Sequence, residues 1–139
     1  MIKEKLAEIL ARAFENAAAE GKLGELKECP VPIQIERPKL AEHGDLACGV
    51  AMKLAGPLKS APIKIAQTLA DYVGKDKEAN GNHIASFSVA PPGFINFKLG
   101  TGWLSESISR IVCEGKDYGR AKLGEGKRVL IEYVSANPT

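Results

Sequence analysis

The chain has 139 residues, of which 45% are hydrophobic and 26% charged, and its formal net charge is +2. A chain of this length can bury about two-thirds of its unfolded surface in one domain, so it needs no disulfide or metal to fold. The small net charge excludes a strongly basic nucleic-acid-binding protein, and any contact with RNA must come from a local surface. No apolar run approaches the ~18 residues of a membrane span, which predicts a soluble protein without a membrane partner.

Three cysteines are present, Cys29, Cys48 and Cys113, and they are widely spaced. An odd number without a CxxC pair is not the pattern of a disulfide framework or a zinc site. We expect them to be small buried hydrophobic residues in a reducing compartment. This predicts a cytoplasmic location and no metal site.

The first third of the chain predicts one helix and one strand. Apolar residues recur every 3.6 positions from Ile2 to about Ala19, which is typical of an amphipathic helix, and glycines at positions 21 and 24 end it. Residues from Val31 to Glu36 alternate between apolar and polar types, which predicts a strand with one buried face. Pro32 pushes the start of this strand toward a sheet edge.

Two further helices are predicted before residue 75. In the first, Asp45 is placed as the N-cap and Gly56 begins the stop signal. In the second, Ser60 is placed as the cap, Pro62 occupies the first turn and Gly74 is the stop. The apolar stripe of the first of these helices comprises Leu46, Ala47, Val50, Ala51, Leu54 and Ala55.

The last elements are a hairpin and a helix. Ile84–Ala90 and Phe94–Leu99 read as strands, and the Pro-Pro-Gly between them is so short that they must be antiparallel. A helix is predicted from about Trp103 to Cys113, and Glu114–Lys127, rich in glycine and charge, is predicted to be a linker. The fold class is α+β, with a mainly antiparallel sheet covered by amphipathic helices. The apolar side chains expected to face inward from the last helix are Leu104, Ile108, Ile111 and Val112.

The second strand of this hairpin suggests a function. Its period of two assigns Ile95, Phe97 and Leu99 to the core. The opposite face carries Phe94, Asn96 and Lys98. An aromatic ring, an amide and a cation in a row can stack an unpaired base, read its edge and hold a phosphate. A Phe in this position is more often a satellite hydrophobic contact, and Asn and Lys are common on solvated faces. We expect this second face to be at least partly exposed.

The segment His43-Gly44-Asp45 offers a histidine beside a carboxylate. Its position favours a helix cap for Asp45 over acid–base catalysis, because free N–H groups of the predicted helix need an acceptor. His43 is then a residue that fixes the loop or faces RNA. His83 has no carboxylate nearby in the sequence and is expected to be exposed where its strand begins.

The C-terminal segment begins with a run of β-branched and aromatic residues, Val129–Val134, followed by Ser-Ala-Asn-Pro. The run predicts a strand buried on both faces. Ligands of parallel α/β sheets bind beyond the carboxyl ends of strands, so this segment looks like the first strand of a nucleotide-binding domain.

Three segments resemble the arginyl-tRNA synthetase family, in the same order: Glu36–Ala55 with its His-Gly-Asp, Val89–Leu99 with its Gly-Phe-Ile-Asn-Phe, and Lys127–Thr139 with its Val-Ser-Ala-Asn-Pro-Thr. The family usually has asparagine where this chain has Gly49. The resemblance implies a tRNA-recognition domain at 1–114, a linker at 115–127 and the first strand of a class I Rossmann-type catalytic domain at 128–139.

The resemblance also implies the chemistry of the parent enzyme, which joins arginine to tRNA(Arg) with ATP and Mg²⁺. The N-terminal domain of the family docks on the elbow of tRNA, where Phe94 and Asn96 correspond to residues that approach an unpaired D-loop base. Glu132, Ser135 and Asn137 correspond to residues that bind arginine. The His-Ile-Gly-His-type and Lys-Met-Ser-Lys-type segments are absent from this sequence. The segment alone is therefore expected to be inactive and to hold no cofactor, and no contact with DNA is implied.

Two alternatives stay open. The chain could be a free-standing RNA-binding module, although this does not account for the strand at Val129–Val134. It could also be a structural domain that braces a catalytic partner.

Overall fold

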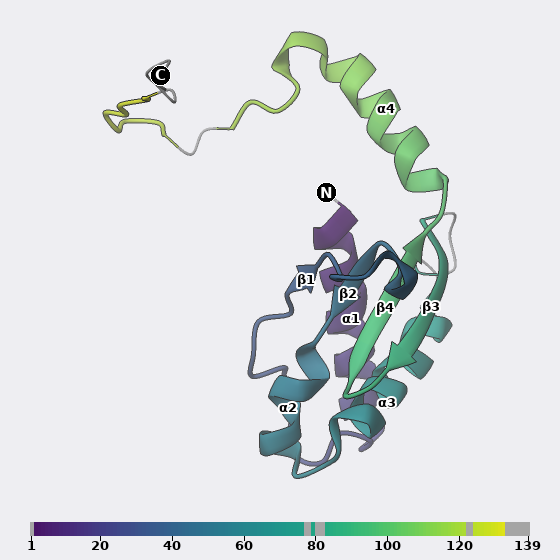
Figure 1. Ribbon diagram of the computed structural model, residues 1–139. Coiled ribbons are helices and arrows are strands. Elements are labelled where there is room, and N and C mark those ends of the chain that lie inside the picture. The colour runs from purple at the N-terminus through teal and green to yellow at the C-terminus, as the bar shows by residue number, and fades with distance from the viewer. Residues whose placement is uncertain (1, 77–78, 80–82, 122–123, 133–139) are drawn as a thin grey trace, which may run out of the picture.

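A computed structural model describes residues 2–76, 79, 83–121 and 124–132 (Figure 1). In chain order the helices and strands are α1 (Ile2–Ala19), β1 (Ile35–Glu36), β2 (Leu46–Cys48), α2 (Val50–Leu58), α3 (Pro62–Lys75), β3 (Ile84–Ala90), β4 (Phe94–Leu99) and α4 (Gly102–Glu114). Two 3₁₀ turns, Ala41–His43 and Gly115–Asp117, lie before β2 and after α4. No helix in the described part of the chain is long and apolar enough to cross a membrane.

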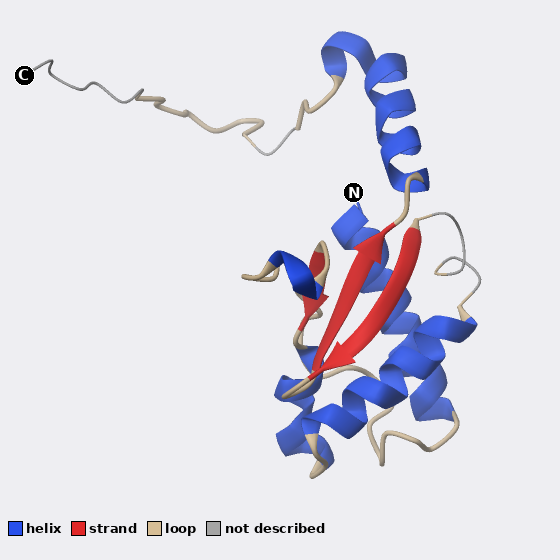
Figure 2. Cartoon of the chain, turned by 45° about the vertical axis from the view of Figure 1, so that its right-hand side comes forward, coloured by secondary structure: helices blue, strands red, loops and turns tan. Residues whose placement is uncertain are grey.

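The strands form one sheet in the order β1-β2-β4-β3, and every neighbouring pair is antiparallel. This confirms the predicted α+β class. The predicted hairpin is also confirmed, because β3 and β4 pair from Ile84 opposite Leu99 to Ala90 opposite Phe94. Figure 2 shows the two long strands side by side, with helices packed behind the sheet.

The hydrophobic core lies between the sheet and the helices α1 and α3 (Figure 1). Ile95 and Phe97 of β4 are fully buried in it, as their alternation predicted, and Leu99 is half-buried. The apolar stripe of α1 was also predicted correctly. Its buried members are Leu6, Ile9, Leu10, Ala13, Phe14 and Ala17.

Polar contacts join α1 to α3 at the edge of this core. The Arg12 guanidinium donates from Nε and Nη2 to the Asp76 carboxylate, at 2.9 and 3.3 Å. The Tyr72 hydroxyl donates to the Glu20 carboxylate. This hydrogen bond, burial and the nearby negative charge raise the pKa of Tyr72 to about 12, because they all disfavour the phenolate.

The structure corrects the prediction that a helix starts at Asp45. Leu46–Cys48 is a strand, and α2 begins only at Val50 with Gly49 as its N-cap. The Asp45 backbone N–H donates to the Phe97 carbonyl at 2.9 Å, and its carboxylate accepts from the Leu99 N–H at 2.8 Å. Asp45 therefore extends the β2–β4 pairing instead of capping a helix.

Gly44 makes this junction possible. Its φ of +94° is rarely adopted by residues with a side chain, and a Cβ atom there would lie 2.7 Å from the Phe97 carbonyl oxygen. The loop from His43 to Asp45 therefore lies tightly against β4.

Four smaller boundaries differ from the predictions. The N-cap of α3 is Ala61, and Ser60 makes no capping hydrogen bond. Helix α2 continues through Pro57 to Leu58, and α3 continues through Gly74 to Lys75. The strand predicted at 31–36 is reduced to β1, because only Ile35 and Glu36 pair with β2.

The largest correction concerns α4. The four side chains predicted to face inward from α4 are 43–75% exposed, and Cys113 is exposed as well. Figures 1 and 2 show why: α4 stands apart from the sheet and its covering helices, so no core lies beside it. Cys48 is buried as predicted, and burial raises the pKa of its thiol. Val129, Leu130 and Ile131 are exposed and form no strand, and residues 133–139 lie outside the described part.

Candidate nucleic-acid interface

The sheet face opposite α1 and α3 carries a groove of about 560 Å³. This volume falls in the usual range of ligand pockets, about 300–1,000 Å³, and suits a nucleotide. Its walls come from β1 and the loop after it, β2, the start of α2, and the hairpin. The side chains that line it include Gln34, Glu36, Arg37, Lys39, His43, Met52, Lys53, Phe94 and Asn96.

Asn96 lies in the wall of the groove, between Ala47 of β2 and Ser88 of β3. Only 7% of the residue is exposed, so the prediction of an exposed Asn96 is wrong. Strands on both sides cover it, which the sequence of β4 alone does not reveal. Among the described residues its side-chain amide has no hydrogen-bond partner. The polar atoms of the amide are nevertheless not among the buried, unpartnered atoms of the structure, so they keep access to solvent. The amide is therefore available to a ligand in the groove.

Phe94 forms the neighbouring part of the wall and is half-buried, as predicted. Its ring passes close to Gly49, where a Cβ atom would lie 3.3 Å from Phe94 Cε1 and 2.8 Å from the Met52 methyl carbon. The departure from the family pattern at Gly49 thus gives the ring room beside α2. One face of an aromatic ring next to an unpaired amide is an arrangement that can stack and read a base.

The groove carries more positive than negative charge. Arg37, Lys39 and Lys53 line it, against a single carboxylate, that of Glu36. Lys53 Nζ donates to Gln34 Oε1 at 2.8 Å, which fixes the oxygen of that amide and leaves its NH₂ group as a donor. Local cations beside a stacking surface are what a phosphate backbone requires, whatever the net charge of the protein.

Two predicted residues lie outside this arrangement or at its margin. Lys98 is exposed, as predicted, but it does not line the groove. His43 lines it, with Nε2 3.9 Å from the Glu42 carboxylate, and it has no contact with Asp45 that would make an acid–base pair. The sequence pattern drew attention to the segment holding Arg37 and His43. It assigned no role to Gln34, Lys39 or Lys53, which the fold brings to the groove from the position before β1, the loop after β1 and α2.

The residues compared with an arginine site cannot be assembled here. Glu132 is exposed, and Ser135 and Asn137 lie outside the described residues. Within the described ranges, no three His, Cys, Asp or Glu residues are placed to hold a metal ion.

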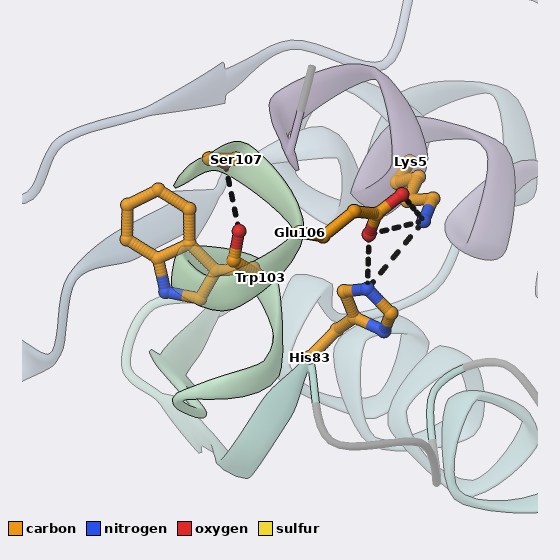
Figure 3. A network of polar contacts seen from close by, with 5 residues as sticks. All are labelled: Lys5, His83, Trp103, Glu106 and Ser107. Carbon is orange, nitrogen blue, oxygen red and sulfur yellow. Dashed lines mark hydrogen bonds and ion pairs between the residues drawn. The ribbon is translucent and has the colours of Figure 1, made fainter. Parts of the chain in front are cut away.

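A second polar cluster lies at the foot of α4 (Figure 3). His83 Nε2 lies 2.6 Å from the Glu106 carboxylate, and Lys5 Nζ donates to the two oxygens of that carboxylate at 3.2 and 3.1 Å. The expectation of an exposed His83 without a carboxylate is wrong, because α4 supplies one that is distant in sequence, and only 28% of the His83 side chain is exposed. The hydrogen bond from His83 and the charge of Lys5 lower the pKa of Glu106.

The fold and the groove define a small α+β domain whose antiparallel sheet is backed by helices and presents a positively charged groove on its open face. The family described as the arginyl tRNA synthetase N terminal domain matches residues 1–99, and the chain belongs to this family.

Relatives and solved structures agree with this assignment. The arginine–tRNA ligase of Caldanaerobacter subterraneus subsp. tengcongensis is 42% identical over 137 residues, which cover 99% of this chain and 23% of the relative. The solved arginyl-tRNA synthetase of Thermus thermophilus superposes with a TM-score of 0.57 at 23% identity, over 77% of this chain and 15% of that one. The Plasmodium falciparum enzyme gives 0.59 at 15% identity, over 79% and 18%. The chain thus spans about a quarter of the length of the curated relatives it matches.

Proposed function

We propose that this domain binds the elbow of tRNA(Arg) and takes an unpaired D-loop nucleotide into the groove. The observation that carries the proposal is the unpaired Asn96 amide beside the Phe94 ring, in a groove whose charged side chains are mainly cations. In this assignment Phe94 stacks on the base and Asn96 hydrogen-bonds to its edge. Lys98, on the same face of β4 but outside the groove, contacts the neighbouring phosphate backbone.

The groove cations support the same assignment. Arg37 and Lys39 follow β1 directly, at the side of the groove opposite the hairpin, so a base seated on Phe94 would have its phosphates within reach of these side chains. Phosphate contacts supply affinity without sequence information, whereas the amide supplies the choice of base.

The whole protein is proposed to be a class I arginine–tRNA ligase of the cytoplasm that uses ATP and Mg²⁺. This rests on the named relatives, which are about four times as long as the chain. We propose a tRNA-recognition domain at 1–114, a linker at 115–127 and the start of the catalytic domain at 128–139. Glu132, Ser135 and Asn137 are proposed to bind arginine, because carboxylate–guanidinium hydrogen bonds are charge-assisted.

A titration of the 139-residue chain with fluorescently labelled tRNA(Arg) tests the RNA-binding part. We expect weak, salt-dependent binding, which the double variant Arg37→Ala/Lys39→Ala weakens. Lys64→Ala is the matched control, because Lys64 lies on α3, outside the groove, and its loss changes the net charge in the same direction. Equal losses from the double variant and from the control, scaled per charge removed, would show that the whole surface acts and the groove does not. Absence of binding even at low salt would leave only a structural role for the domain.

A further inference from the structure

Exposed apolar side chains are unevenly distributed along the chain. Among the described residues, Leu40 is the only large exposed hydrophobic residue within the family domain, 1–99. The others all follow it: Leu104, Ile108, Ile111, Val112, Tyr118, Val129, Leu130 and Ile131. The family domain therefore buries its own apolar surface, while the residues after it do not.

On α4 these side chains form one continuous stripe. Leu104, Ile108, Ile111 and Val112 stand at i, i+4, i+7 and i+8, which places them on one face of the helix. Isolated apolar side chains are ordinary on a surface, but an uninterrupted stripe along more than two turns is the pattern of a helix that packs against another element.

The family domain holds the other face of the helix. Glu106 is two residues from both Leu104 and Ile108, or about 200° around the helix, and so lies opposite the stripe. Through Glu106 the helix binds Lys5 of α1 and His83 at the entry to β3 (Figure 3). The polar face is thus fixed to the domain, and the apolar stripe points away from it.

We propose that this stripe is the docking surface for the catalytic domain of the ligase, the domain that Val129–Ile131 begins. The inference rests on the proposed function of the whole protein. Its occupant follows from the comparisons: the relative from Caldanaerobacter aligns with 99% of this chain, α4 included, and more than three-quarters of its length lies outside the aligned region.

The run at Val129–Ile131 favours the same occupant. Three consecutive exposed apolar residues need cover on both faces of the backbone, which a parallel sheet flanked by helices provides. A second copy of this chain would provide a matching stripe, but the sheet in its described residues is antiparallel. In the proposed arrangement α4 is clamped to the RNA-binding domain by one face and to the catalytic domain by the other, so it sets the distance between the groove and the reaction centre.

Hydrogen exchange tests this proposal. The 139-residue chain is compared with a chimeric ligase in which the chain replaces the 137 aligned residues of the Caldanaerobacter enzyme. We expect the amides of α4 to exchange at least tenfold more slowly in the chimera. Arginyl-adenylate formation, measured in parallel, reports separately on the proposed enzymatic function.

Two matched variants locate the contact. Ile108→Asp places a charge in the stripe, and Ser109→Asp places the same charge one residue away, off the stripe and equally exposed to solvent. In the chimera we expect Ile108→Asp to remove the protection of α4 and Ser109→Asp to retain it. Both variants should bind tRNA as well as the unchanged 139-residue chain, because neither residue lines the groove.

Three results would overturn the inference. The first is equal exchange of α4 in the chain and in a chimera that forms adenylate, which would reject the interface while the proposed function stands. The second is equal protection in the two aspartate variants. The third is self-association of the 139-residue chain in sedimentation equilibrium, abolished by Ile108→Asp, which would identify a second copy as the occupant. Lack of adenylate formation with α4 protected would instead count against the proposed enzyme and leave the interface intact.

Discussion

Replacing Asn96 with alanine separates recognition from stability. Among the described residues the Asn96 amide makes no hydrogen bond, so its removal breaks no internal hydrogen bond and leaves no partner unsatisfied. The free energy of unfolding should therefore change by less than about 1 kcal/mol. A base-edge contact contributes about 1–3 kcal/mol of discrimination, which corresponds to a loss of about 5- to 150-fold in affinity for the preferred base.

The measurement is fluorescence anisotropy with tRNA(Arg), alongside urea unfolding of the same preparations. Ser88→Ala is the matched control, because Ser88 lies directly opposite Asn96 on β3 but does not line the groove. It should bind tRNA like the unchanged chain. D-loop variants of the tRNA complete the experiment, since the alanine variant at position 96 should lose its preference among them.

Either of two results would contradict a base-reading role for Asn96. If Asn96→Ala binds every D-loop variant as the unchanged chain does, the amide reads no base. If it lowers the free energy of unfolding by several kcal/mol, the side chain is structural, and a loss of binding would follow from unfolding.

Four other substitutions have definite expected outcomes. Lys98→Ala should weaken tRNA binding whatever the D-loop sequence and reduce the slope of log affinity against log salt by about 1, measured by anisotropy at several salt concentrations. Gly44→Ala should lower the free energy of unfolding in urea by at least about 2 kcal/mol, because Gly44 has a positive φ and a Cβ atom there would clash with the β4 backbone. Gly56→Ala should instead raise it by about 0.5–1 kcal/mol, because Gly56 occupies an open position of α2. Because the pKa of Tyr72 is raised in the folded state, its phenol ionises first in the unfolded state, near pH 10. The free energy of unfolding should therefore fall as the pH rises from about 10 to about 12. Tyr72→Phe, which has no group to ionise beside Glu20, should lose that part of the pH dependence. An unchanged pH profile in the phenylalanine variant would contradict the assignment.

Local patterns predicted the elements whose stability comes from their own periodicity. Helix α1 and the β3–β4 hairpin begin and end where the sequence placed them. An amphipathic helix or an alternating strand has one apolar face, and packing that face against any apolar surface is enough to stabilise it. Leu46–Cys48 shows the limit. Its residues fit a helical stripe as well as a strand, and pairing with β4, about fifty residues away, decides between the two.

The groove and the face of α4 could not be predicted for a related reason. Gln34 and Lys53 are nineteen residues apart, and nothing in either segment announces their hydrogen bond. The apolar stripe of α4 was recognised from its periodicity. Periodicity indicates that such a stripe packs against another element, but it does not indicate which domain supplies that element. Phe94 and Asn96 were found from the alternation of their strand, and the resemblance then strengthened the case for them. The burial of Asn96 depends on the strands to either side.

The single tryptophan of the chain, Trp103, occupies the first turn of α4 (Figure 3), and its carbonyl accepts a hydrogen bond from Ser107 Oγ at 2.7 Å. It is half-buried where the helix leaves the sheet. Its emission wavelength therefore reports on the junction and on nothing else in the 139 residues. Tryptophan fluorescence can therefore follow α4 in unlabelled protein, at micromolar concentration and in real time. It would detect movement of the helix, its separation from the family domain at low pH, or its binding to a catalytic domain.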